Sequence, residues 1–196
     1  MRFLFAVFIM IIFSVKTFSQ AELIDLPIDS TTGRISYTEV VMVDSSLSKQ
    51  ELYSRAREWF AKTYNSSTNV IQMDDKESGK IVGKALMQVY CRSLGSDRKC
   101  GFVNYTISIY FKEGRYKFEL TDFYHTGQVI SSDNVMPDYG ACENWINDKR
   151  KYPMMSQKAV QKISIYFLKQ LDEKANALLV DLKQAMKSKA SLKPDW

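Results

Sequence analysis

Apolar and polar residues alternate through the middle of the chain, as they do in β-strands with one buried face. In the segment FVNYTISIYF, residues 102–111, every second residue from Val103 onward is apolar, and alternate residues of a strand project from opposite faces. The segment YKFELTDFYH, residues 116–125, follows the turn KEGR, and strands joined by so short a turn can only be antiparallel. Three further segments rich in apolar or β-branched residues predict strands at residues 37–43, 70–74 and 81–91.

The segment SKQELYSRAREWFAKTY, residues 48–64, follows the helical period instead. Ser48 and Glu51 form the pair of a capping box, in which each side chain satisfies a backbone donor at the start of a helix. Trp59 and Phe60 share one face with the other apolar residues, so we expect them in the core, whereas Arg55 falls on the side expected to face solvent. Glutamates dilute the positive charge of this helix, which argues against a nucleic-acid surface.

A second helix is predicted over residues 156–189, where apolar residues recur at intervals of three and four. At ~1.5 Å per residue it spans on the order of 50 Å, against about 30 Å for a strand of nine residues. We therefore expect the half beyond Ala175 to reach past the sheet and to need another neighbour. This end is basic and could dock a partner, a second copy of the chain or an anionic membrane surface through Lys183, Lys187, Lys189 and Lys193.

A long irregular stretch, residues 126–153, separates the last strand from this helix. Loops of this length are uncommon in compact domains unless they are functional or held by their own side chains. Packing onto the body through Tyr139, Cys142, Trp145 and Ile146 is the reading we favour, and a functional role stays open.

The order of these elements predicts the fold class. We expect a single α+β domain over residues 37–190 with the order β-α-β-β-β-β-α, preceded by an irregular lead at residues 22–36. One sheet face is apolar, so both helices should cover that face of a curved antiparallel sheet and leave the polar face open.

The first residues have the layout of a secretory signal peptide, which we place at residues 1–21. Arg2 precedes an uncharged apolar run of thirteen residues, 3–15, whereas a membrane-spanning helix needs about 20. Small residues permit cleavage after either Ser19 or Ala21. We therefore expect an exported chain, in the periplasm or cell envelope of a Gram-negative bacterium, with at most peripheral membrane contact.

Charge and cysteine content refine this picture. The chain carries 27 basic and 22 acidic residues, a net charge of +5, and loss of Arg2 and Lys16 with the signal peptide lowers the excess further. This balance is too mild to predict nucleic-acid binding. Cys91 and Cys100 flank the polar stretch RSLGSDRK between two predicted strands, so they are the expected disulfide pair in an oxidising compartment, and the state of Cys142 stays open.

No arrangement of residues predicts catalysis. The only histidine, His125, has no metal-ligand spacing to the cysteines, and the chain contains no glycine-rich phosphate loop or nucleotide fingerprint. We therefore predict that the protein is not an enzyme and has no cofactor or metal site.

The phrases EVVMVDSSLSKQELYSRAREWFAKTY and YTISIYFKEGRYKFELTDFYH, in this order of elements, resemble a known family. It is the exported domain of unknown function 4468, which has a TATA-binding-protein-like (TBP-like) fold, similar to a helix-grip arrangement, and is common in Bacteroidetes. The resemblance covers roughly residues 37–125 and the start of the final helix. It implies export and a curved sheet backed by helices. It implies no activity and no site residues, and shape alone does not confer DNA binding.

The polar sheet face is the first candidate site, as part of an exported binding module. Such a face can bind the edge of an unknown envelope protein or a glycan, and self-association through the C-terminal helix is a further possibility. Its predicted members are Lys84, Gln88, Tyr90, Asn104, Thr106, Ser108, Tyr110, Lys117, Glu119 and Thr121.

The alternative is a carrier of a small apolar ligand. A long helix on a curved sheet can enclose an apolar pocket. The side chains expected to line it are Tyr105, Phe111, Tyr116 and Phe118.

Overall fold

The computed structural model describes residues 24–93, 96–131, 134–135, 137–146, 148–149 and 155–187. The predicted signal peptide with both cleavage points, and the basic residues Lys189 and Lys193, lie outside this part of the chain. Within the described residues, no helix is both long and apolar enough to cross a membrane.

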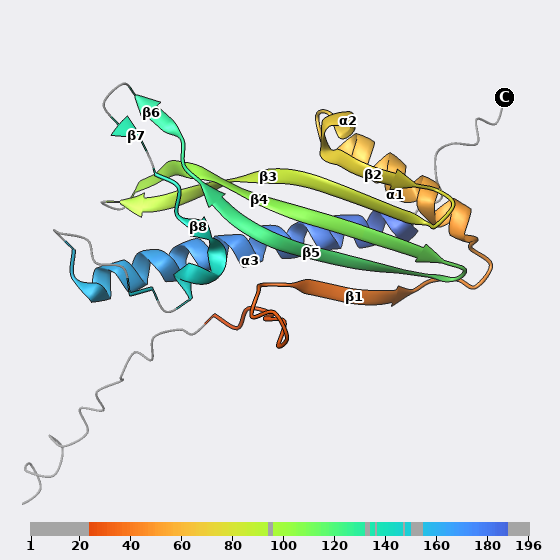
Figure 1. Cartoon of the computed structure of the whole chain (residues 1–196), viewed down its shortest axis with the longest axis horizontal. Helices are drawn as coiled ribbons and strands as arrows, with labels where there is room; N and C mark the ends of the chain where they lie inside the picture. The colour runs from red at the N-terminus through yellow and green to blue at the C-terminus, as the bar shows by residue number, and fades with distance from the viewer. Residues whose placement is uncertain are drawn as a thin grey trace, which may run out of the picture.

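The fold is α+β, as predicted, with an antiparallel sheet in the order β1-β5-β4-β3-β2. Its strands are β1 (Tyr37–Met42), β2 (Ile71–Asp75), β3 (Lys80–Ser93), β4 (Ser96–Lys112) and β5 (Arg115–Thr126). The helices are α1 (Lys49–Thr63), the short α2 (Ser67–Val70) and α3 (Gln157–Lys187). Figure 1 shows the strands running lengthwise, with α1 and α3 passing behind them.

Between β5 and α3 the described residues form short elements. β8 (Gly140–Ala141) adds to β5, and β6 (Val129–Ser131) pairs with β7 (Asn134–Val135) apart from the main sheet. A single 3-10 turn, η1 (Cys142–Trp145), follows β8.

Both long helices cover the apolar sheet face, as the alternation predicted. Ser48 caps α1 by accepting a hydrogen bond of 3.1 Å from the backbone N–H of Glu51. Trp59 and Phe60 are buried in the core, which confirms their assignment. Arg55 was wrongly placed toward solvent: it is buried, and its guanidinium donates 2.7 Å to the carbonyl oxygen of Met186.

The C-terminal half of α3 does not overhang the sheet, so that expectation was wrong. Leu182 and Met186 are fully buried in the main core, and Trp59 of α1 donates a hydrogen bond of 2.8 Å to Asp181. The strands are longer than their apolar segments, because β4 has 17 residues and so extends on the order of 56 Å. The 31-residue helix, at about 46 Å, fits within that length.

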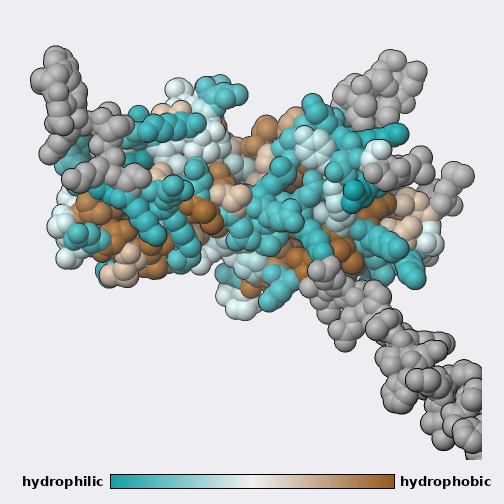
Figure 2. All heavy atoms as spheres, turned by 180° about the vertical axis from the view of Figure 1, so that it is seen from behind, coloured by the Kyte–Doolittle hydropathy of each residue, from teal (hydrophilic) through white to brown (hydrophobic). Residues whose placement is uncertain are grey.

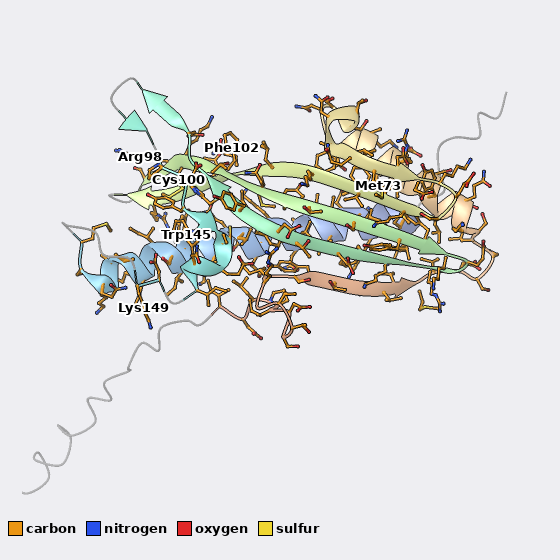
Figure 3. The ribbon with its side chains drawn as sticks, in the orientation of Figure 1. Met73, Arg98, Cys100, Phe102, Trp145 and Lys149 are labelled. Carbon is orange, nitrogen blue, oxygen red and sulfur yellow. A yellow bond between two sulfur atoms is a disulfide. The ribbon has the colours of Figure 1, made fainter. Side chains whose placement is uncertain are left out.

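His125 organises the end of the sheet where α3 begins. Its buried ring accepts the backbone N–H of Tyr139 at Nδ1, at 3.3 Å, which leaves Nε2 as the donor to the carbonyl of Cys100 at 2.6 Å. Trp145 lies at the same end (Figure 3) and stacks on Phe167 of α3 with ring centroids 4.0 Å apart. The prediction that the 126–153 stretch packs onto the body through Tyr139, Cys142, Trp145 and Ile146 is confirmed for these four side chains.

Cys91 and Cys100, the pair expected from the sequence, are joined by a disulfide across the β3–β4 hairpin. Cys142 is a free thiol in the core, where burial raises its pKa far above the ordinary value. A thiol in that state stays protonated and unreactive at neutral pH.

Removing this disulfide should destabilise the domain moderately. We expect the double variant Cys91→Ser, Cys100→Ala to lose about 2–3 kcal/mol in the free energy of unfolding, because the bridge restricts the unfolded chain. Urea denaturation with and without reductant measures the loss, and the reduced wild type should approach the variant. Equal stability of the oxidised and reduced wild type would show that the bridge contributes nothing.

Candidate binding face

The open face of the sheet collects most of the polar residues predicted to share it. Lys84 lies opposite Thr106, which in turn lies opposite Thr121. The same alternation places nine of the predicted residues in one row on this face, with Gln88 at one end. The other eight are Lys84, Asn104, Thr106, Ser108, Tyr110, Lys117, Glu119 and Thr121.

Tyr90 keeps its place in the alternation of β3. The register with β4 shifts between Gln88 and Tyr90, but the extra residue lies on β4, where Cys100 and Gly101 oppose Val89, so Tyr90 has the same parity as Lys84 and Gln88. The backbone of Tyr90 is bonded to the side-chain amide of Gln170 in α3, which accepts the N–H at 3.2 Å and donates to the carbonyl at 2.6 Å. Gln170 thereby occupies the edge of β3 beyond the end of β2.

The predicted residues do not form one compact site, because they extend along the length of the sheet. Asn104, toward the His125 end, donates 3.0 Å to Thr126, and Ser108 is buried among its neighbours. Tyr110, Lys117 and Glu119 lie together near the β4–β5 turn. This end of the face is the part with a defined geometry.

Tyr110 is the centre of the cluster at the β4–β5 turn. The ammonium groups of Lys80 and Lys117 lie 5.3 Å and 5.9 Å from its ring centroid, within the range of cation–π attraction. Its hydroxyl donates 3.2 Å to Glu119. Lys117 also pairs with Glu119 at 2.5 Å, and this hydrogen bond raises the pKa of the ammonium.

A hollow of about 590 Å³ opens beside this cluster. We call it the basic groove; its walls are Val40, Tyr110, Lys112, Arg115, Tyr116, Lys117 and Glu119. Lys112 and Arg115 are exposed, and no ion pair within the described part of the chain involves either of them. The groove therefore has more positive than negative charge on its walls.

The sequence did not single out Lys80, Lys112, Arg115 or Val40. Lys112 and Arg115 are directly opposite each other at the strand ends, in the same alternation as Tyr110 and Lys117. Their shared face could be predicted from the sequence by extending the two strands to the turn. The position of Val40 beside Lys117 could not be predicted in this way, because it depends on the lateral pairing of β1 with β5.

Exposed apolar side chains also collect on this face. The described part of the chain has eight large apolar side chains with high exposure, and the register places five of them on the open face: Val40, Met42, Met73, Leu86 and Tyr124. Met42 is 68% exposed and Val40 55% exposed, and both adjoin the basic groove. On the far side of the molecule, shown in Figure 2, apolar side chains appear only as separate patches between hydrophilic ones.

The end of α3 that carries the C-terminal lysines was predicted to be free, but one of these lysines contacts the sheet. Lys183 pairs with Glu39 of β1 at 2.5 Å and lies 5.5 Å from the ring centroid of Phe118. Lys187 is exposed at the end of α3. Docking through this end stays a prediction.

No metal centre is present among the residues that the structure describes, since no three of their His, Cys, Asp and Glu side chains cluster. The open face instead offers cations and exposed apolar groups. Such a surface can hold an acidic ligand through charge and contact area, without bond-making chemistry.

Comparison with known proteins places the fold. Residues 37–126 match the family described as "Domain of unknown function (DUF4468) with TBP-like fold", and no curated protein sequence matches the chain. The crystal structure of a DUF4468 family protein from Bacteroides ovatus ATCC 8483 is similar, with a TM-score of 0.61 at 20% identity, covering 88% of this chain and 96% of that one. That of a TBP-like protein from Parabacteroides distasonis ATCC 8503 has a TM-score of 0.53 at 16% identity, covering 78% and 94%. At such identities the likeness concerns the fold alone, so the comparisons show an α+β, TBP-like fold, within which residues 37–126 match the DUF4468 family model.

Proposed function

We propose that the protein is an exported, non-enzymatic binding module, and that the basic groove on its open sheet face captures an acidic group of a ligand in the cell envelope. The observation that carries this proposal is the charge around Tyr110. Lys112, Arg115 and Lys117 line the groove, against one carboxylate among its lining residues, Glu119.

An acidic ligand would supply the counter-charge that this arrangement lacks. Ion pairs on an exposed surface are weak individually, so the groove also needs contact area to bind usefully. Val40 and Met42 provide it, because they are apolar, exposed and beside Lys117 and Arg115 in the register. A basic pocket with an apolar rim favours a ligand that is acidic and partly apolar.

Export is supported by two independent features. The apolar run at residues 3–15 has the length and flanks of a signal peptide, and the Cys91–Cys100 disulfide suits an oxidising compartment. The intact mass of the chain purified from its native envelope tests this part: it should begin after Ser19 or Ala21.

The packing beneath the sheet favours the open face over an internal pocket. Tyr105 bonds to Tyr64 through their hydroxyls at 3.1 Å, and Phe111 packs edge-on against Tyr53. Tyr116 and Phe118, the other two side chains expected to line a carrier pocket, are also buried in the core. These four aromatic groups are therefore occupied by contacts with the protein itself.

Site-specific photo-crosslinking in the native host tests the binding face. A photoreactive residue at Val40 should form adducts with an envelope component, and one at Val180 should not. Val180 is a matched control because it is also a valine, 63% exposed, but lies on α3. Adding Arg115→Glu with Lys117→Glu should reduce the adducts at position 40 about tenfold, because attraction at two sites becomes repulsion.

Two results would refute the proposed function. Equal adduct yields at the two positions would show that the open face is not selective. Adducts at position 40 that are unchanged by the double charge reversal would show that the groove does not recognise acidic groups.

A further inference from the structure

β1 is a free edge of the sheet beside the basic groove. It ends the strand order, and β5 is its only strand neighbour among the described residues. The N–H of Val43 donates to the carbonyl of Gly114, toward β5, and backbone direction alternates along a strand. The backbone groups of Thr38, Val40 and Met42 therefore point outward.

This edge has little of the usual protection against strand addition. Edge strands are commonly blunted by shortness, charged side chains, proline, a bulge or a covering segment, and the one charged residue of β1, Glu39, lies on the helix side, where it pairs with Lys183. The sequence YTEVVM contains neither lysine nor proline, and its register with β5 is unbroken over six residues. Within the described part of the chain, no hydrogen bond is formed by the outward N–H groups of Thr38, Val40 and Met42.

Two of these three residues adjoin the cations of the groove, and the third, Thr38, lies opposite Glu119. Val40 lies opposite Lys117 and Met42 lies opposite Arg115, on the open face. A strand added to β1 would lie about 4.8 Å from it and about twice that from β5. Arg115, which forms no ion pair within the described residues, can reach past β1 toward acidic side chains on the added strand, and Lys117 can do so by exchanging Glu119 for a new carboxylate.

We infer that β1 takes up an acidic, extended segment of a partner protein as an additional strand, with its carboxylates on the open face toward Arg115 and Lys117. This rests on the proposed function and names its ligand. Backbone hydrogen bonds to Thr38, Val40 and Met42 supply affinity, and the groove selects acidic residues at the two positions beside Val40 and Met42, which lie opposite Lys117 and Arg115.

Charge argues against a second copy of the chain at this edge. On the open face, β1 offers only Thr38, Val40 and Met42, none of them acidic. Two β1 strands paired edge to edge would place two basic grooves on one continuous face, and like charges so placed repel.

The cluster also argues against a glycan that stacks on Tyr110, since two ammonium groups already lie over its ring. A glycan would in addition leave the outward backbone groups of β1 without the partner that a strand provides.

A designed peptide tests the inference on the chain from Glu22 onward, which contains every described residue. The probe is an acetylated, amidated octapeptide in which glutamate alternates with valine. Its two controls replace glutamate by lysine, or carry N-methyl groups on alternate amides so that they cannot pair with an edge. We expect the glutamate probe to bind at least about tenfold more tightly than either control, since both charge and strand pairing contribute.

Amide exchange locates the probe. Binding should slow hydrogen exchange at the amides of Thr38, Val40 and Met42, and Arg115→Glu with Lys117→Glu should transfer the preference to the lysine peptide. The matched variant Lys158→Glu with Lys162→Glu makes the same charge change on exposed positions of α3 and should leave the preference unchanged.

The outcomes separate this inference from the proposed function. If the N-methylated peptide binds as tightly as the probe, strand addition is refuted while capture of acidic groups stands. If a sulfated oligosaccharide protects the groove and the peptide does not bind, the partner class is wrong and the proposed function stands. If neither the glutamate peptide nor the sulfated oligosaccharide binds, and the charge reversal leaves the envelope crosslink unchanged, both the strand-addition inference and the proposed function are refuted.

Discussion

A chain that ends after Ala175 is expected not to fold. The truncation removes Leu179, Leu182 and Met186, all buried in the main core, and each such side chain contributes about 1.5–3 kcal/mol. It also removes Asp181, which accepts the indole N–H of Trp59, and the carbonyl of Met186, which accepts from Arg55. The summed loss, about 5–9 kcal/mol from the apolar groups alone, is comparable to the whole stability of an ordinary domain.

Circular dichroism and urea denaturation measure this effect. A chain that ends at Lys187 is the matched control, because it keeps every α3 contact named above, and it should unfold as cooperatively as the full chain. If the chain ending at Ala175 stays within about 1 kcal/mol of the control, the distal half of α3 is not part of the core. Because truncation should unfold the domain, docking by this end is better tested by substituting the exposed Lys187.

The sequence was sufficient for the element order and for the two sheet faces. Alternation separates Val103 and Ile107 from Thr106, and the capping pair locates the start of α1. The length of β3 and β4 was missed, because their hairpin continues through polar pairs such as Arg92 opposite Asp97. Backbone pairing holds such residues in a strand whatever their polarity. Their polar composition, taken alone, predicted a loop there.

On the candidate face, too, local patterns predicted some features, and others depended on how the strands pair. Residues on one strand were grouped by parity, but the shift in register between β3 and β4 could not be read from the sequence, since a bulge depends on strand pairing. The bulge lies at Gly101, where φ is +104° and an added Cβ would lie 2.2 Å from the carbonyl oxygen of Thr126. The groove itself needs β1 beside β5, and strand order is decided by packing rather than by any local pattern.

Phe167→Ala should destabilise the His125 end of the domain strongly. Phe167 is fully buried, stacks on Trp145 and meets the His125 ring edge-on at 5.7 Å. Its removal should lower the free energy of unfolding by about 3–5 kcal/mol, the usual loss for a buried phenylalanine when the cavity does not collapse. The stacked indole and the imidazole, which is held by hydrogen bonds on both nitrogens, leave little freedom for such collapse.

Urea denaturation of Phe167→Ala beside Val180→Ala distinguishes this packing from a general effect on the helix. Val180 is an exposed position of the same helix, so its substitution should change the free energy of unfolding by no more than about 0.5 kcal/mol. A lower denaturation midpoint should accompany the Phe167 variant only. A loss below about 1 kcal/mol would mean that the stretch from β8 to η1 is held without Phe167, and that its anchoring depends on the hydrogen bonds of His125 instead.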